Sequence, residues 1–139
     1  MKGYGMTEVR ALIIDKPENK PFHTPLVPGN LKPMIKALEA GGITAKCAVP
    51  QTSQELIRVI QDHSPDIVFS AAYGIEDEKG ESNNVHRILE GLGVPYIGST
   101  SGVLDIAIDK TRLKDIWIKE GIRTPPYAGF NRSEHSLAN

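Results

Sequence analysis

The segment Val9-Arg10-Ala11-Leu12-Ile13-Ile14 is short, apolar and rich in branched side chains, and it ends at Asp15. A run of this length and composition is typical of a buried strand. The following residues, 16–30, contain four prolines and show no consistent period. They are therefore predicted to form a loop over the carboxyl end of this first strand, the edge at which open α/β sheets bind ligands.

Beyond this loop the chain alternates between helical and extended patterns. Apolar residues at helical spacing predict helices over 31–40, 53–63 and 82–91, the first with Asn30 as its N-cap. Apolar runs predict further strands over 43–49, 66–70 and 94–97, with a loop over 71–81. Strands joined by single helices run parallel through right-handed crossovers. We therefore expect an α/β fold, a Rossmann-like parallel sheet of about four strands (βαβαβαβ) with helices on both faces.

After residue 98 the pattern changes to helices without strands. Helices are predicted over 101–108 and 109–120, the second capped by Asp109 and followed by Gly121. The prolines at 125 and 126 then force an extended chain. This gives four predicted parts: a disordered N-terminus (1–7), a Rossmann-like domain (8–99), linker helices (100–124) and an extended tail (125–139).

The composition excludes several classes of protein. The 139 residues suffice for one ordinary domain, and a net charge of −1 gives no electrostatic reason to expect nucleic acid or an anionic membrane as a partner. Cys47 is the only cysteine, so no intrachain disulfide or Cys-based metal site is expected. No apolar run approaches the ~18 residues of a membrane helix. We expect a cytoplasmic protein that binds a small molecule or another protein surface.

Familiar nucleotide and phosphoacceptor motifs are missing. No GxGxxG follows the first strand, there is no GxxxxGK[ST], and the third strand ends in Ser70-Ala71-Ala72 rather than in an acid. The loop after it carries four carboxylates, at Glu76, Asp77, Glu78 and Glu81, which either form a solvated loop before a helix capped by Ser82 or direct Glu81 toward a bound amine. Gly98-Ser99 could offer backbone N–H groups to an anion or could simply form a tight turn.

A family resemblance rests on two stretches of the chain. They are Gly93-Val94-Pro95-Tyr96-Ile97-Gly98-Ser99 and Ile108-Asp109-Lys110-Thr111-Arg112-Leu113-Lys114. They resemble the signature that closes the first domain of D-alanine:D-alanine ligase-type ATP-grasp enzymes and leads into the nucleotide-binding part. Leu89-Glu90 and Gly80-Glu81 stand where that family has the same pairs. The resemblance covers residues 66–127 well and residues 9–49 only by pattern.

The chain also departs from that family. Ala71-Ala72-Tyr73-Gly74 replaces a His-Gly pair, and Ser82-Asn83 replaces Asp-Gly. The first loop lacks the family's Gly-Gly-x-Ser-x-Glu-x-x-Ser run and offers only Glu18, His23 and Thr24 as polar candidates. These departures resemble a divergent branch whose substrates are often not D-alanine.

The resemblance implies that this chain would act together with further domains of a ligase. Such enzymes form an acyl phosphate from ATP and a carboxylate, which an amine then attacks, with Mg²⁺ stabilising phosphoryl charge. Glu81, Gly98 and Ser99 would lie on the side of an amino-acid or related carboxylate substrate, and Lys110 and Lys114, one turn apart on one helix face, would contact ATP. No catalytic residue or metal ligand is implied here. The central and C-terminal ATP-grasp domains would be the missing partners, without which we expect no tightly bound ATP or Mg²⁺ and no ligase activity.

A second hypothesis is a stand-alone Rossmann-like module for small-molecule binding or dimerisation. A domain built to function alone should present a polar outer face over its last helices. Residues 104–118 are instead rich in apolar side chains (Leu104, Ile106, Ile108, Ile116, Trp117 and Ile118). This pattern favours a fragment or self-association as a homodimer.

Overall fold

The structure, a computed structural model, describes residues 8–15 and 28–128, with side chains from residue 31 onward in the second range. The expectations for residues 1–7, for the loop that holds Glu18, His23 and Thr24, and for the end of the tail lie outside these residues. The described chain divides into two compact units, and the boundary along the chain lies between Ser101 and Gly102.

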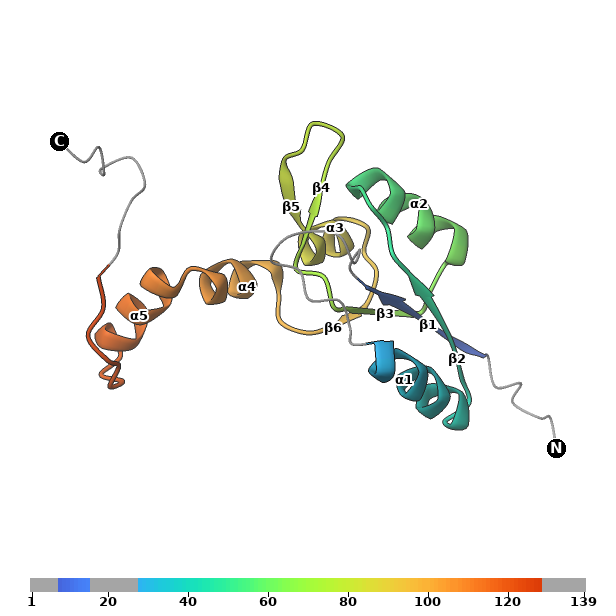
Figure 1. The fold of residues 1–139 in the computed structure, drawn as a ribbon, viewed down its shortest axis with the longest axis horizontal. Helices are drawn as coiled ribbons and strands as arrows, with labels where there is room; N and C mark the ends of the chain where they lie inside the picture. The colour runs from blue at the N-terminus through green and yellow to red at the C-terminus, as the bar shows by residue number, and fades with distance from the viewer. Residues whose placement is uncertain (1–7, 16–27, 129–139) are drawn as a thin grey trace. The chain divides into compact units, whose positions relative to one another are not determined.

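The first unit contains a four-stranded parallel sheet (Figure 1). Its strands are β1 (Val9–Ile14), β2 (Ile43–Ala48), β3 (Ile67–Ser70) and β6 (Tyr96–Ile97), arranged in the order β2-β1-β3-β6. Helices α1 (Pro28–Ala40), α2 (Ser53–His63) and α3 (Val85–Gly91) connect them. The predicted α/β fold with parallel strands is confirmed.

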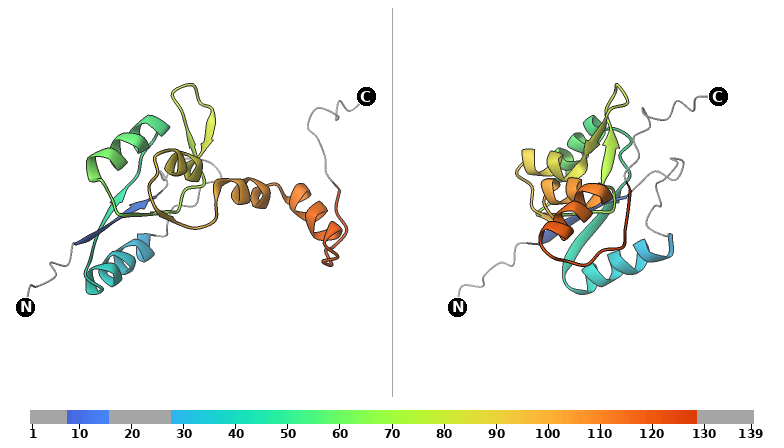
Figure 2. Two further views of the ribbon diagram at one scale, coloured as in Figure 1. Left: turned by 180° about the vertical axis from the view of Figure 1, so that it is seen from behind. Right: turned by 90° about the vertical axis from the view of Figure 1, so that its left-hand side faces the viewer.

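Helices cover both faces of this sheet (Figure 2), with α2 and α3 on one face and α1 on the other. The core lies between the sheet and the pair α2 and α3, where six side chains have no exposed surface: Leu12, Ile14, Leu56, Val68, Val85 and Leu89. Removing an aliphatic side chain of this size from water contributes roughly 1.5–3 kcal/mol. The central position of β1 explains why its last four residues are buried without the alternation of a half-exposed strand.

The segment after β3 differs from the prediction. Residues 74–84 form an antiparallel hairpin of β4 (Gly74–Glu76) and β5 (Ser82–Asn84) instead of a loop followed directly by a helix. The turn forms because Asp77 Oδ1 accepts hydrogen bonds from the backbone N–H groups of Lys79 and Glu81, both at 2.8 Å. Gly80 has φ of +81°, which favours glycine.

The predicted cap of α3 is therefore wrong. Ser82 lies in β5, and α3 begins at Val85 with Asn84 as its N-cap, whose Oδ1 accepts from the backbone N–H of His86 at 2.9 Å. The cap predicted for α1 is also wrong, since that helix begins at Pro28 and includes Asn30. Proline is favoured at a first helical position, where its missing N–H costs no hydrogen bond.

The second unit holds α4 (Ser101–Ile108, whose first residue belongs to the first unit) and α5 (Lys110–Lys119). Both helices were predicted. Asp109 caps α5 as expected, because its Oδ1 accepts from the N–H groups of Thr111 and Arg112 at 3.1 and 3.0 Å. Gly121 follows the helix with φ of +73°. Among the described residues, no helix has the length and apolarity needed to cross a membrane.

Candidate functional site

The carboxyl ends of the parallel strands place several candidate residues along one edge of the sheet. Asp15 follows β1, Ser70 ends β3, and Gly98-Ser99 follow β6. Asp15 is buried, and its backbone N–H donates to the carbonyl oxygen of Ala48 at 2.9 Å. This edge is where ligands bind in open α/β sheets, so it is the candidate site of the first unit.

The Gly98-Ser99 turn packs directly on the imidazole of His86. Gly98 has φ of +135°, and a Cβ atom added there would lie 2.9 Å from Cε1 of His86. His86 Nδ1 lies 2.8 Å from the carbonyl oxygen of Ser99. Because a carbonyl oxygen can only accept, Nδ1 carries the proton in this contact. The position thus requires glycine for two reasons, its backbone conformation and the close approach of a ring.

His86 itself is 3% exposed, and its Nε2 has no hydrogen-bond partner among the described residues. Its ring also packs against Tyr96, with the ring centroids 4.5 Å apart. His86 therefore contacts the turn through Nδ1 and Cε1, and its ring packs on Tyr96 of β6. Sequence reasoning missed this residue, because its contact with Ser99 spans 13 positions and leaves no local pattern.

A second cluster, the Glu90 cluster (Glu90, Tyr96 and Ser101), lies next to this turn. Glu90 Oε1 accepts from the Tyr96 hydroxyl at 2.6 Å and from the Ser101 backbone N–H at 2.8 Å, and Oε2 accepts from the Ser101 hydroxyl at 2.6 Å. The hydrogen bond from the Ser101 hydroxyl, followed by that from Tyr96, lowers the pKa of Glu90 to about 2. The same contact raises the pKa of Tyr96. Glu90 is thus an ionised acceptor that fixes both ends of the segment between β6 and α4.

Glu81 lies on the exposed turn of the β4–β5 hairpin. The hairpin is joined to the start of α2, because Asn83 Nδ2 donates to the Ser53 hydroxyl and that hydroxyl donates to the Glu76 carbonyl oxygen, both at 3.3 Å. Figure 1 shows the hairpin turn projecting away from the segment that joins β6 to α4. Within the described part of the chain, no hydrogen bond joins Glu81 to Gly98 or Ser99. The structure therefore does not bring these three predicted residues together.

Lys110 and Lys114 both lie on α5 in the second unit. Lys110 is the exposed first residue of the helix. Lys114 Nζ donates to the carbonyl oxygen of Pro125 at 3.3 Å and lies 5.1 Å from the ring centroid of Tyr127. The Tyr127 hydroxyl in turn donates to Asp115. Lys114 thus has a structural role, in which it holds the extended segment 125–127 against its own helix.

Among the described residues, no three His, Cys, Asp or Glu side chains lie close enough together to hold a metal ion. Cys47 is a free thiol, and burial, followed by the nearby charge of Asp15, raises its pKa. A raised pKa keeps the thiol protonated and unreactive at neutral pH.

No family model matches the chain. Individual relatives do. The D-alanine–D-alanine ligase of Saccharophagus degradans is 35% identical over 97 residues, which are 70% of this chain and 29% of that protein. The enzyme of the same name from Pelagibacter ubique is 34% identical over 92 residues, or 66% of this chain and 29% of that protein.

A shorter match to the D-alanine–D-alanine ligase of Gloeobacter violaceus reaches 39% identity over 66 residues, 48% of this chain and 21% of that protein. The chain thus spans about three-tenths or less of the length of these curated relatives. The resemblance inferred from the Pro-Tyr-x-Gly-Ser and Asp-Lys stretches is confirmed. Over roughly two-thirds of its length, the chain is homologous to the D-alanine–D-alanine ligases.

Proposed function

We propose that the chain is the substrate-side, N-terminal domain of an ATP-dependent carboxylate–amine ligase. The observation that carries this proposal is the 35% identity to a D-alanine–D-alanine ligase over 97 residues. The parallel sheet supports it, because a turn follows the carboxyl end of β6, at the edge where such a domain would contact its substrate.

The proposed contribution of this domain is to position one substrate. The backbone N–H groups of Gly98 and Ser99 would face a substrate carboxylate, and His86 and Glu90 hold that turn in place. Glu81 would approach a substrate ammonium group only if the hairpin turn moved toward this edge. The substrate class is an amino acid or a related carboxylate.

The phosphoryl-transfer step would be carried by residues outside this chain. ATP supplies the phosphoryl group and Mg²⁺ neutralises its charge. Within this chain, Lys110 would take part in the step, because it is an exposed cation at the start of α5 that suits a phosphate. Because the relatives are more than three times as long as the matched segment, we expect the 139-residue chain alone to release no phosphate from ATP.

A chimera tests the proposal. The matched segment of the Saccharophagus degradans enzyme is replaced by this chain, and phosphate release is measured with D-alanine and with a panel of other amino acids. ATP turnover that depends on at least one amino acid, and that is lost in a matched chimera carrying Gly98→Val, is the expected result. A folded chimera that turns over no ATP with any amino acid contradicts the proposal.

One observation favours the alternative of a self-associating module. The second unit exposes several large apolar side chains by more than half: Val103, Ile108, Ile118 and Ile122. Val103, Ile108 and Ile118 lie on the two helices and Ile122 follows the second, and exposed apolar residues gathered on so short a segment are typical of an interaction surface. Light scattering at increasing concentration measures the association. A dimer that becomes monomeric in Ile108→Ser/Ile118→Ser would support this alternative, and a monomer at all concentrations would remove it.

A further inference from the structure

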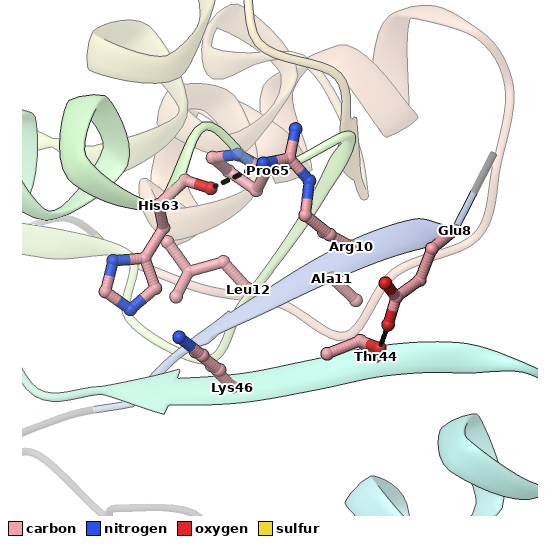
Figure 3. Close-up of a pocket in the computed structure, with 8 residues that line it drawn as sticks. All are labelled: Glu8, Arg10, Ala11, Leu12, Thr44, Lys46, His63 and Pro65. Carbon is pink, nitrogen blue, oxygen red and sulfur yellow. Dashed lines mark hydrogen bonds between the residues drawn. The ribbon is translucent and has the colours of Figure 1, made fainter.

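A cavity of about 140 Å³ lies beside the first halves of β1 and β2 (Figure 3). Its side chains come from β1, β2, the last residue of α2 and the segment before β3. All strands of the sheet are parallel, so this cavity is near their amino ends, whereas Gly98 and Ser99 follow a carboxyl end. We call it the amino-edge cavity, and it is separate from the candidate site described above.

The register of the sheet explains why charged side chains gather here. Arg10 pairs with Thr44, and Leu12 pairs with Lys46. Successive side chains of a strand alternate between faces, and directly paired residues share a face. Arg10, Leu12 and Lys46 therefore all lie on the α2 side of the sheet, where His63 ends that helix.

The guanidinium of Arg10 is held in place before any ligand binds. Its Nε lies 3.6 Å from Asp66 Oδ2, and its Nη1 donates to the carbonyl oxygen of His63 at 3.4 Å. The same Asp66 oxygen also accepts from the Arg10 backbone N–H at 2.7 Å. Asp66 Oδ2 is thus engaged with Arg10, and the Arg10 side chain lines the cavity.

Among the other polar groups of the lining, hydrogen-bond donors outnumber the acceptors available to them. Glu8, the acid in the lining, accepts a hydrogen bond from the Thr44 hydroxyl. In residues 8–15 and 28–128, neither the Lys46 ammonium nor the His63 ring makes a hydrogen bond or an ion pair. Figure 3 shows the Lys46 side chain rising from β2 on the side of the sheet that His63 occupies. A ligand that accepts hydrogen bonds would therefore find free donors at these two residues.

Pro65 gives the lining a partly exposed apolar side chain, whereas the side chain of Leu12 is fully buried. The size of the cavity limits the ligand, since an engineered cavity of about 150 Å³ in another protein holds benzene. We propose that the amino-edge cavity binds a small aliphatic carboxylate of about six non-hydrogen atoms. The carboxylate contacts Lys46 and His63, and the alkyl group lies on Pro65. This assigns a second ligand site, which does not depend on the proposed ligase function.

Nuclear magnetic resonance titration of the full 139-residue chain tests the assignment. Three probes are compared at one ionic strength, because salt screens exposed charges: isobutyrate, the neutral isobutyramide of the same shape, and inorganic phosphate. Isobutyrate is expected to shift the amide signals of Thr44, Lys46 and His63 in a saturable way. Isobutyramide and phosphate are expected to bind more weakly, the first because it lacks charge and the second because it lacks an alkyl group.

Variants locate the binding. Lys46→Gln and His63→Gln each raise the dissociation constant for isobutyrate by about threefold or more, as expected for the loss of one polar contact at a partly exposed site. Both positions are at least partly exposed, so neither change removes a core side chain. Lys36→Gln, at an exposed lysine on α1, is the matched control and should leave the constant within about twofold. Shifts that never saturate, equal binding of isobutyramide, or equal affinity in Lys46→Gln would overturn the assignment.

Discussion

The carboxylate of Glu90 accepts two hydrogen bonds from Ser101, one from its backbone N–H at 2.8 Å and one from its hydroxyl at 2.6 Å. Ser101 is the first residue of α4, so its N–H belongs to the helix-terminal groups that have no partner within the helix. Glu90 supplies that partner from α3, and a negative charge is favoured at a helix N-terminus. A residue 11 positions away in the chain thus defines where α4 begins.

Replacing Glu90 by glutamine is therefore expected to lower the melting temperature of the chain. Glutamine offers one acceptor oxygen in place of two, and its NH₂ group faces a donor where the carboxylate accepted. Thermal unfolding measured by circular dichroism gives the effect. Glu39→Gln serves as the control and should leave the melting temperature unchanged, because Glu39 is exposed on α1 and its side chain makes no hydrogen bond or ion pair with the described residues. Equal melting temperatures for wild type and Glu90→Gln would contradict the role assigned to Glu90.

The contribution of Glu90 should depend on pH in a defined window. Its pKa is lowered from 4.5 to about 2 in the folded chain, so ionisation of Glu90 favours the folded state. The stabilisation is fully present above pH 4.5 and is lost as the pH falls toward 2. The difference in melting temperature between wild type and Glu90→Gln is expected to be constant from pH 5 to 8 and to shrink in acid. A difference that grows as the pH falls would have the wrong sign.

Gly98→Ala should destabilise the first unit by about 1–3 kcal/mol. An alanine there would keep a strained φ of +135° and place its Cβ 2.9 Å from His86 Cε1. Urea unfolding followed by fluorescence or circular dichroism measures the loss. Gly91→Ala is the matched control, because nothing lies within 4 Å of an added Cβ and φ is not positive at that residue. A Gly98→Ala chain as stable as Gly91→Ala would show that the turn does not pack on His86 as described.

The sequence predicted the sheet and most helices because their signals are local. The largely apolar run at 9–14 and the helical spacing of Leu56 and Ile60 each indicate their own secondary structure within a few residues. The β4–β5 hairpin was not predicted, because its strands carry little local signal. Its strands, Gly74-Ile75-Glu76 and Ser82-Asn83-Asn84, contain a single β-branched residue, Ile75, and no aromatic one, and the side chain of Asp77 holds the turn between them.

The candidate site was predictable only in part. Gly98 and Ser99 were chosen because they follow a strand within a recognisable stretch, and their binding role stays a prediction. Their supports, His86 and Glu90, were assigned no role, because each acts through a partner 11 or 13 positions away that only the folded chain brings close. For Lys114, helical spacing predicted its position on α5 correctly. The spacing did not indicate that its ammonium group would contact the Pro125 carbonyl oxygen and the Tyr127 ring.

Asn84→Ala is expected to destabilise the first unit by about 0.5–2 kcal/mol, the usual cost of losing an N-cap. Its Oδ1 accepts from the N–H of His86 at 2.9 Å at the start of α3. Asn84→Asp keeps the accepting oxygen but loses the hydrogen bond from Nδ2 to the Ser101 carbonyl oxygen at 3.3 Å, so it should retain only part of the stability. Ser82→Ala should have little effect because Ser82 is not the cap. Urea unfolding of the three variants decides the matter. A larger loss for Ser82→Ala than for Asn84→Ala would restore Ser82 as the cap.

Lys114→Gln should loosen residues 125–127 without unfolding α5. The lysine ammonium donates to the Pro125 carbonyl oxygen at 3.3 Å and lies over the Tyr127 ring, and glutamine is too short to keep both contacts. Amide relaxation in solution should show faster motion at Tyr127 in Lys114→Gln and no change in Lys110→Gln, whose lysine is the exposed first residue of the helix.

In the ligase chimera, the substitution of Lys110 rather than that of Lys114 should have the larger effect on the KM for ATP. There Lys110→Gln should raise the KM for ATP more than Lys114→Gln does, because Lys110 is free to approach a phosphate while Lys114 is engaged. If Lys114→Gln alone raised that KM and left Tyr127 unchanged, the structural role of Lys114 would be refuted.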